Sequence, residues 1–343
     1  LKRLKIKVVR PCINNCYAEF KASKNTIHYG LGAIKNVGFL AISNIIQERE
    51  KNGKFKSLID FINRVNPKDV NKLQLEGLVK AGAFDQIDKN RKKLFVSIPK
   101  IIQTIKNKFD EKISKQSNLF EGDSSNEIEK FEFELEESWS KKELLAEEFL
   151  SLGFYISDHP LNEYKEIFSQ LKIKSYKEFI KDDTNESLVA GTIMSIQEKK
   201  SSKGTAFAIV KFSDNNSEFE IFLFSELLIQ NRDKLKESNS FILTLQKDKL
   251  IAENTQRRIN IRKILNLSEM INKPYEKVFI ELNNDYDLQE LKNTLKEEGE
   301  TEIQLIIKDK NKKLSFKLEK PRKFDLSIFN NVKNKQYVKK ISF

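Results

Sequence analysis

The chain has 343 residues, of which 39% are hydrophobic and 10% aromatic, which is enough apolar material to bury the cores of more than one domain. Lys and Arg outnumber Asp and Glu by 62 to 50, giving a net charge of +12; this excess attracts polyanions, although an AT-rich genome that favours Lys codons would produce it too. No apolar run approaches the roughly 18 residues that a membrane span needs, and the start of the chain lacks the apolar core of a signal peptide, so we expect a cytoplasmic protein with no membrane partner.

Residues 1–112 are predicted to form a helical domain. The first residue is Leu1, which indicates a fragment of a longer protein, and a short strand is predicted at 6–9. The turn that follows holds the only two cysteines, Cys12 and Cys16; a lone CxxxC is at most half of a zinc site, so free thiols are favoured. Apolar residues at helical spacing then predict helices, the last of them kinked at Pro99, over 39–53, 57–65, 71–80 and 89–114.

Glycines precede the first of these helices, in HYGLGAIKNVGF. Gly30, Gly32 and Gly38 lie where a missing side chain lets a partner approach the backbone and where the N–H groups of a helix start attract an anion. Two glycines joined by an apolar residue beside a helix are typical of helix-hairpin-helix modules, which hold the DNA backbone without reading bases. Lys80 and Gly82 would belong to a second hairpin. On these residues alone, two ordinary helix caps are an equal alternative.

Residues 113–138 are acidic, Ser-rich and weakly periodic, which predicts a tether. At its edge, QSNLF combines the amide of Gln116, which can fix register through hydrogen bonds, with Leu119 and Phe120, which suit a hydrophobic pocket on a partner. The alternative is that the two apolar side chains pack back on the helical domain. A helical connector is predicted over 139–185.

Alternation of period two takes over in residues 186–270. Five strands, with one helix after the third, match a small closed barrel. The strands are predicted at 187–198, 205–214, 217–224, 240–248 and 258–267, and the helix at 225–235. Barrels of this kind bind single-stranded nucleic acid with aromatic and cationic side chains near the first loop and the last strand. The candidates for this role are Lys199, Lys200, Lys203, Phe207, Arg257 and Arg258, with solvated lysines and a buried Phe207 as the alternative.

Residues 275–343 are predicted to form a small α+β tail domain. Its elements would be a strand, a helix ended by Gly299, two more strands and a last helix; the first four are placed at 277–282, 288–297, 302–307 and 314–320. The fold class is therefore multidomain α+β: a helical helix-hairpin-helix domain, a five-stranded barrel and this tail.

Motifs of catalysis are missing from the sequence. GxxxxGK[ST], HExxH and GxSxG are absent, and His28 and His159 are the only histidines, so general-base chemistry with a supporting triad is hard to build. Asp158 stands beside His159, but Pro160 favours a turn there. We do not expect the chain alone to be an enzyme.

Several stretches occur in a fixed order along the chain: IHYGLGAIKNVG, GKFKSLIDFINRV, LVKAGAFD, QSNLF and LGFYISDHPLNEY, followed by the barrel. In this order they resemble the C-terminal third of the bacterial DNA polymerase III alpha subunit, a C-family replicative polymerase, over nearly the whole chain. The resemblance implies the end of the fingers with a helix-hairpin-helix pair, a sliding-clamp-binding motif, an OB-fold and a tail domain. PCINNC departs from the cysteine-free turn of relatives, and the tail matches least well.

The resemblance also implies roles and partners. Gly30, Gly32, Lys35 and Gly38 would lie near duplex phosphates, and the anchors of the sliding clamp would be Gln116, Leu119 and Phe120. The partners would be primer–template duplex, single-stranded template, the clamp and, for the tail, the clamp-loader tau subunit. The aspartates that bind Mg²⁺ in this DNA-directed DNA polymerase (a nucleotidyltransferase) would lie in a palm domain upstream of Leu1. No catalytic residue, metal ligand or cofactor is therefore expected in this chain.

Two rival interpretations use the same residues. The first is a free-standing single-strand-binding or repair accessory protein that uses the barrel without a polymerase. The second is a protein-binding scaffold, for which the basic loop of the barrel would be incidental. Salt-dependent DNA binding would contradict the second.

Overall fold

The structure is a computed structural model that describes residues 6–117, 136–248, 258–267, 269, 275–283, 285–309 and 312–343. Two compact units make up the chain, Leu1–Pro160 and Leu161–Phe343, and each is described by itself. The boundary falls inside the predicted connector 139–185, so the first helix of this connector belongs to the first unit. Within the described ranges, no helix is both long and apolar enough to cross a membrane.

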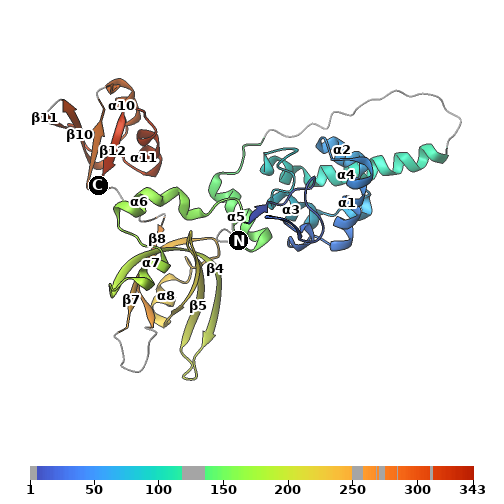
Figure 1. Cartoon of the computed structure of the whole chain (residues 1–343), viewed down its shortest axis with the longest axis horizontal. Helices are drawn as coiled ribbons and strands as arrows, with labels where there is room; N and C mark the ends of the chain where they lie inside the picture. The colour runs from blue at the N-terminus through green and yellow to red at the C-terminus, as the bar shows by residue number, and fades with distance from the viewer. Residues whose placement is uncertain are drawn as a thin grey trace. The chain divides into compact units, whose positions relative to one another are not determined.

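The first unit is mainly helical (Figure 1). Its helical elements are η2 (Leu31–Ala33), α1 (Phe39–Asn52), α2 (Leu58–Arg64), η3 (Pro67–Asp69), α3 (Lys72–Lys80), α4 (Arg91–Ser117) and α5 (Lys141–Leu152). A sheet of order β1-β3-β2 precedes α1 and is formed by β1 (Lys7–Val9), β2 (Lys21–Ser23) and β3 (Thr26–His28). We predicted only the first of these strands, because three residues carry too little alternation to be recognised. The helix α4 runs through Pro99 as one element.

The four predicted helices of this unit are confirmed, and side-chain caps mark the starts of two of them. Ser57 and Asn71 accept hydrogen bonds from the N–H groups of Asp60 and Gln74 and so cap α2 and α3, as their side chains favour. The apolar faces of α1 to α4 meet in one core, which includes Ile42, Ile45, Phe61, Leu75, Leu78, Leu94 and Ile98.

The predicted tether lies between two stretches of the same unit. Residues 118–135 lie outside the described residues, yet the chain on both sides belongs to the first unit. The helix α4 ends at Ser117, and Glu136 lies near the start of the same helix: its carbonyl accepts from Asn90 Nδ2 at 2.8 Å, and its carboxylate is 3.5 Å from Lys92 Nζ. The described residues on both sides of the acidic segment therefore belong to one unit.

The second unit contains an antiparallel sheet of order β6-β5-β4-β7-β8. Its strands are β4 (Glu186–Lys200), β5 (Ala206–Ser213), β6 (Glu218–Leu223), β7 (Ser240–Lys247) and β8 (Ile259–Asn266). Three helices accompany the sheet, namely α6 (Lys165–Gln170), α7 (Tyr176–Lys181) and α8 (Ser225–Asn231). The five predicted strands and the helix between the third and fourth are confirmed.

The strand β4 is the centre of this sheet. Residues 186–192 pair with β7 and residues 192–200 pair with β5, and the register shifts between Ile193 and Ser195. A bulge of this kind bends a strand and increases its twist, so one long strand serves two neighbours. Alternate residues of the surrounding strands fill the core beneath it, among them Val210, Phe212, Ile221, Phe241 and Leu243.

The tail has a four-stranded sheet of order β11-β10-β9-β12. Its elements are β9 (Lys277–Leu282), α10 (Leu288–Thr294), β10 (Glu298–Asp309), β11 (Lys312–Lys317), α11 (Leu326–Lys333) and β12 (Val338–Ser342). Gly299 lies inside β10 and does not end the helix as we predicted. A Cβ on Gly299 would lie 2.4 Å from the backbone nitrogen of Lys323, so the glycine permits a close chain crossing.

Candidate nucleic-acid interface

The first hairpin lies between η2 and α1, at Lys35–Gly38. Asn36 has φ +65°, a left-handed conformation that Asn tolerates better than most residues, and this residue makes the reversal. Ile34 and Val37 are buried and hold the hairpin down, whereas Lys35, Asn36 and Gly38 are exposed. The hairpin therefore presents one cation and a glycine directly before a helix.

The start of α1 is free of side-chain capping. Its N-cap is Gly38, and the first turn holds no acidic residue. The N–H groups of an uncapped first turn carry a partial positive charge and have no partner in their own helix. Together with Lys35, this helix start can bind the phosphate of a nucleic acid backbone.

Two other helices hold this hairpin in place. The Lys35 N–H donates to the carbonyl oxygen of Ser151, in α5, at 3.0 Å. On the other side, a Cβ on Gly77 of α3 would lie 2.6 Å from the Lys35 carbonyl oxygen. Contact this close is possible only with glycine, so α3 and α5 together fix the position of Lys35.

Gly30 and Gly32 face neighbouring parts of the chain. A Cβ on Gly30 would lie 2.7 Å from the Phe20 nitrogen, and one on Gly32 would lie 3.0 Å from the Ala18 carbonyl oxygen. Leu31 and Gly32 donate backbone hydrogen bonds to the carbonyls of Tyr17 and Ala18. The space beside these two glycines is thus filled by residues 18–20 and the Phe39 ring, and the exposed hairpin consists of Lys35, Asn36 and Gly38.

The second hairpin joins α3 to α4 around Gly82, which has φ +79°. Arg91 lies against it and makes a two-pronged ion pair with Asp85, at 2.8 and 2.6 Å. Lys80 pairs with Glu147 at 2.9 Å and lies over the Phe95 ring. The charge of Lys80 is therefore compensated inside the unit, in contrast to that of Lys35.

Sequence reasoning missed Glu148 in α5, which is fully buried. Its Oε1 accepts hydrogen bonds from the backbone N–H groups of Ile156 and Ser157 at 2.8 and 2.9 Å, and its Oε2 lies 3.9 Å from Arg91 Nη1. The carboxylate thus ties the turn of GFYIS to the second hairpin. A single glutamate among many in an acidic stretch gives no sequence signal for such a role.

The cysteine turn packs into the core of the first unit. Both thiols are free and buried, and burial raises the pKa of Cys16 to about 11, so this thiol stays protonated at neutral pH. Buried Arg49 donates to the carbonyls of Ile13 and Cys16 at 2.8 and 2.6 Å. Among the described residues, no cluster of three or more His, Cys, Asp or Glu side chains could hold a metal ion.

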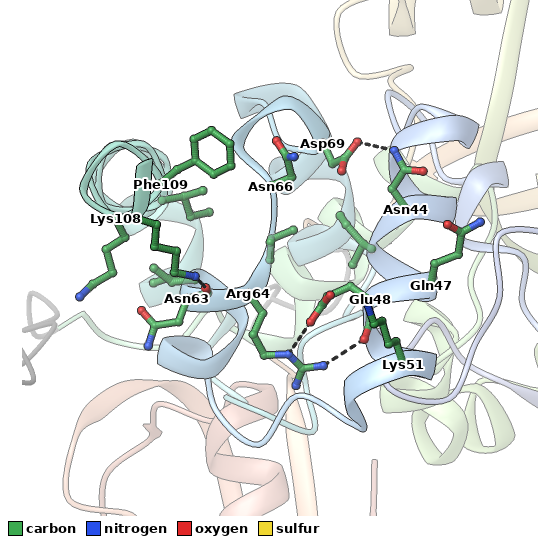
Figure 2. A pocket seen from close by; sticks show the side chains of 15 residues that line it. Asn44, Gln47, Glu48, Lys51, Asn63, Arg64, Asn66, Asp69, Lys108 and Phe109 are labelled. Atoms are coloured by element: carbon green, nitrogen blue, oxygen red, sulfur yellow. Dashed lines mark hydrogen bonds and ion pairs between the residues drawn. The ribbon is translucent and has the colours of Figure 1, made fainter. Parts of the chain in front are cut away.

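A cavity of about 420 Å³ lies between α1, α2 and α4. Figure 2 shows two contacts among its lining residues: Arg64 pairs with Glu48, and Asn44 donates to Asp69. Arg64 also reaches Asp60 at 3.1 Å and the carbonyl of Gly53. The cavity is a polar junction between helices, and Lys51, Lys108 and Lys112 also line it.

The second unit carries aromatic and basic residues on the outer face of β5 and β6. Phe207 pairs across the sheet with Lys199, and its ring lies 6.2 Å from that of exposed Phe222. Arg258 lies over the ring of exposed Phe224. Lys200 and Lys203 are exposed beside them, whereas Arg257 lies outside the described residues. We did not select Phe222 and Phe224 from the sequence. Phe222 fits the ordinary alternation of a strand, and Phe224 stands at the start of a helix.

The residues of QSNLF are only partly described. Gln116 belongs to the last turn of α4, while Leu119 and Phe120 lie outside the described residues. Their predicted role in clamp binding stays a prediction.

Comparison with known proteins adds the decisive observation. The helix-hairpin-helix motif matches residues 5–94. The DNA polymerase III alpha subunit of Borreliella burgdorferi is 34% identical over 307 residues, 86% of this chain and 26% of the relative. That of Buchnera aphidicola is 31% identical over 342 residues, 96% and 29%, and that of Rickettsia bellii is 35% identical over 223 residues, 64% and 19%.

This chain is similar to the C-terminal part of the bacterial DNA polymerase III alpha subunits. It spans about a quarter of the length of these relatives. The predicted resemblance is confirmed, and so is the helix-hairpin-helix motif within it. The matched motif ends at residue 94. The helix α5, which accepts the hydrogen bond from Lys35, therefore lies outside the matched residues.

Proposed function

We propose that the chain is the DNA- and clamp-binding part of a cytoplasmic replicative DNA polymerase III alpha subunit, in which a catalytic domain of the longer protein, with its Mg²⁺ ions, joins the nucleotides. The observation that carries this proposal is the exposed Lys35 hairpin before an uncapped helix, inside a matched helix-hairpin-helix motif. The relatives above are all named as polymerase subunits, which favours this interpretation over an accessory protein.

The hairpin should hold duplex DNA by its phosphates. Lys35→Ala should weaken duplex binding several-fold at physiological salt and reduce the slope of log K against log salt by about one, because one released counterion is lost. Fluorescence anisotropy of a labelled duplex across a salt series measures both quantities. Lys296→Ala, an exposed lysine in the tail, is the matched control and should leave slope and affinity unchanged. An unchanged slope for Lys35→Ala would contradict phosphate contact at the hairpin.

We further propose that the five-stranded sheet closes into an OB-fold that binds single-stranded template. Its strand order, with the first strand between the second and the fourth, suits this fold, in which the face of strands two and three and the loops beside it take oligonucleotides. Phe207 and Phe222 would stack on bases while Lys199, Lys200, Lys203, Arg257 and Arg258 follow the backbone. For the tail we propose the clamp-loader tau subunit as partner.

The clamp proposal rests on Gln116, Leu119 and Phe120. Changing all three to Ala should abolish binding to a purified sliding clamp, because a short peptide depends on a few buried anchors. Calorimetry at physiological salt measures the loss, and duplex binding by the same variant is the control, which should be unchanged. Equal loss of clamp and DNA binding would contradict separate sites. Linked on one chain, modest affinities for clamp and DNA reinforce one another through effective concentration.

A further inference from the structure

The helix α1 ends in Asn52, which is followed by Gly53. This is the only Asn–Gly pair in the sequence. In such a pair the main-chain nitrogen of the glycine can attack the side-chain amide carbon of the asparagine, because glycine has no side chain to hinder the approach. A fold prevents this reaction where it buries the pair or holds that nitrogen in a hydrogen bond. The surroundings of Asn52 and Gly53 are therefore decisive.

Both residues of this pair are exposed. A Cβ on Gly53 would meet no atom within 4 Å, and among the described residues the Gly53 N–H has no hydrogen-bond acceptor. The glycine at the equivalent position after α5, Gly153, donates to the carbonyl of Phe149 at 2.7 Å. The Gly53 nitrogen is thus accessible to hydroxide, which can remove its proton.

The side chain of Asn52 belongs to the junction between α1 and α2. Its Nδ2 donates to Glu48 Oε1 at 2.8 Å, and the same oxygen accepts from Arg64 Nε at 3.0 Å (Figure 2). Arg64 also donates to the Gly53 carbonyl at 2.8 Å. A carboxylate at position 52 would lose the hydrogen bond to Glu48 and repel that carboxylate one turn away. It would also lie at the negative end of the helix dipole.

We propose that Asn52 and Gly53 form a site of spontaneous deamidation and that the products weaken the junction between α1 and α2. After its proton passes to hydroxide, the Gly53 nitrogen forms a bond to Asn52 Cγ, and the amide nitrogen leaves as ammonia with a proton from water. Water then opens the cyclic imide. Opening at the side-chain carbonyl gives aspartate, and opening at the main-chain carbonyl gives isoaspartate, so both products carry a carboxylate at this position.

Mass spectrometry of the folded 343-residue chain, aged at neutral and mildly alkaline pH, tests the site. A glutamate-specific protease used in mild acid releases residues 51–76. The mass gain from replacing –NH2 by –OH should be found at Asn52 and should accumulate faster at the higher pH. Asn63, Asn66 and Asn71 lie in the same peptide and are internal controls, which should stay unconverted.

Two results would overturn the assignment of the site. If Asn52 stays unconverted in the folded chain but converts in urea, the last turn of α1 protects the amide. If the three control asparagines convert as fast, the reaction is not set by this pair.

Gly53→Ala tests the main-chain attack. It should slow the conversion of Asn52 about ten-fold, because a Cβ hinders ring closure. Gly53 also has φ +83°, which strains alanine, so Asn52→Gln is the second variant; its longer side chain cannot close the five-membered ring, and position 52 should stay unconverted. An unchanged rate in both variants contradicts attack by the Gly53 nitrogen.

Asn52→Asp tests the consequence, because it carries the charge of the product from the start. Its first unit should unfold about 2 to 4 °C below that of the wild type, since a repulsion and an unfavourable dipole contact replace a hydrogen bond. The fluorescence of Trp139, the only tryptophan, reports the midpoint. Asn52→Ala removes the same hydrogen bond without adding a charge and should lose less. Equal losses, or no loss in Asn52→Asp, would show that the products do not weaken the junction by their charge.

Discussion

Replacing Glu148 by leucine should lower the free energy of unfolding of the first unit by about 4 kcal/mol. The buried carboxylate accepts from the N–H groups of Ile156 and Ser157 and lies beside Arg91. Removing it leaves both N–H groups without their acceptor and takes from Arg91 one of its two carboxylates, while Asp85 remains. Trp139 is the only tryptophan and packs at 5.6 Å from the Phe95 ring in this unit, so its fluorescence during urea unfolding reports the unit selectively.

Two further variants sharpen this measurement. Glu148→Gln keeps one acceptor for the two N–H groups and should lose about half as much as Glu148→Leu. Glu147→Gln changes the neighbouring carboxylate, which is partly exposed and paired with Lys80, and should cost less than about 1 kcal/mol. A loss below about 1 kcal/mol for Glu148→Leu would mean that this carboxylate does not hold the unit together.

Gly77→Ala should destabilise the first unit by about 2 kcal/mol and weaken duplex binding, although alanine is the better helix former. Helix propensity alone predicts a gain of about 1 kcal/mol in the middle of α3. The new Cβ, however, would lie 2.6 Å from the Lys35 carbonyl oxygen, which is backbone and cannot rotate away. Overpacking of this kind costs about 1 to 3 kcal/mol and displaces the hairpin.

The measurement for Gly77→Ala pairs urea unfolding with duplex titration. Lys72→Ala, on the exposed side of the same helix, is the control for propensity and should change stability by less than about 0.5 kcal/mol. A Gly77→Ala protein that is more stable than wild type, with unchanged affinity, would show that α3 does not fix the hairpin.

The sequence located the hairpin region but could not separate its glycines. Gly30, Gly32 and Gly38 look alike in the pattern, and only the fold distinguishes the two that let residues 18–20 approach closely from the one that begins a helix. Asn36, which makes the reversal, gives a weak signal because Asn is common in every kind of turn. Strand alternation was strong in β4 to β8 and was therefore read correctly.

Contacts over long sequence separations could not be predicted at all. The hydrogen bond from Lys35 to Ser151 joins residues on opposite sides of the acidic segment, and the burial of Glu148 depends on a turn and an arginine from different helices. Such partners are chosen by packing, which a single sequence does not reveal. Propensity and periodicity predict helices and strands, whereas these residues make contacts between different helices and turns.

Residues on both sides of the acidic segment belong to the first unit, and this affects the order in which the unit folds during synthesis. During synthesis the residues of the matched motif, 5–94, emerge well before Glu148 and Ser151. At about 5 to 20 residues per second, Lys35 waits about 6 to 23 s for Ser151, its hydrogen-bond acceptor, and Arg91 waits about half as long for Glu148, its second carboxylate. The first unit therefore finishes folding only after the acidic segment has left the ribosome.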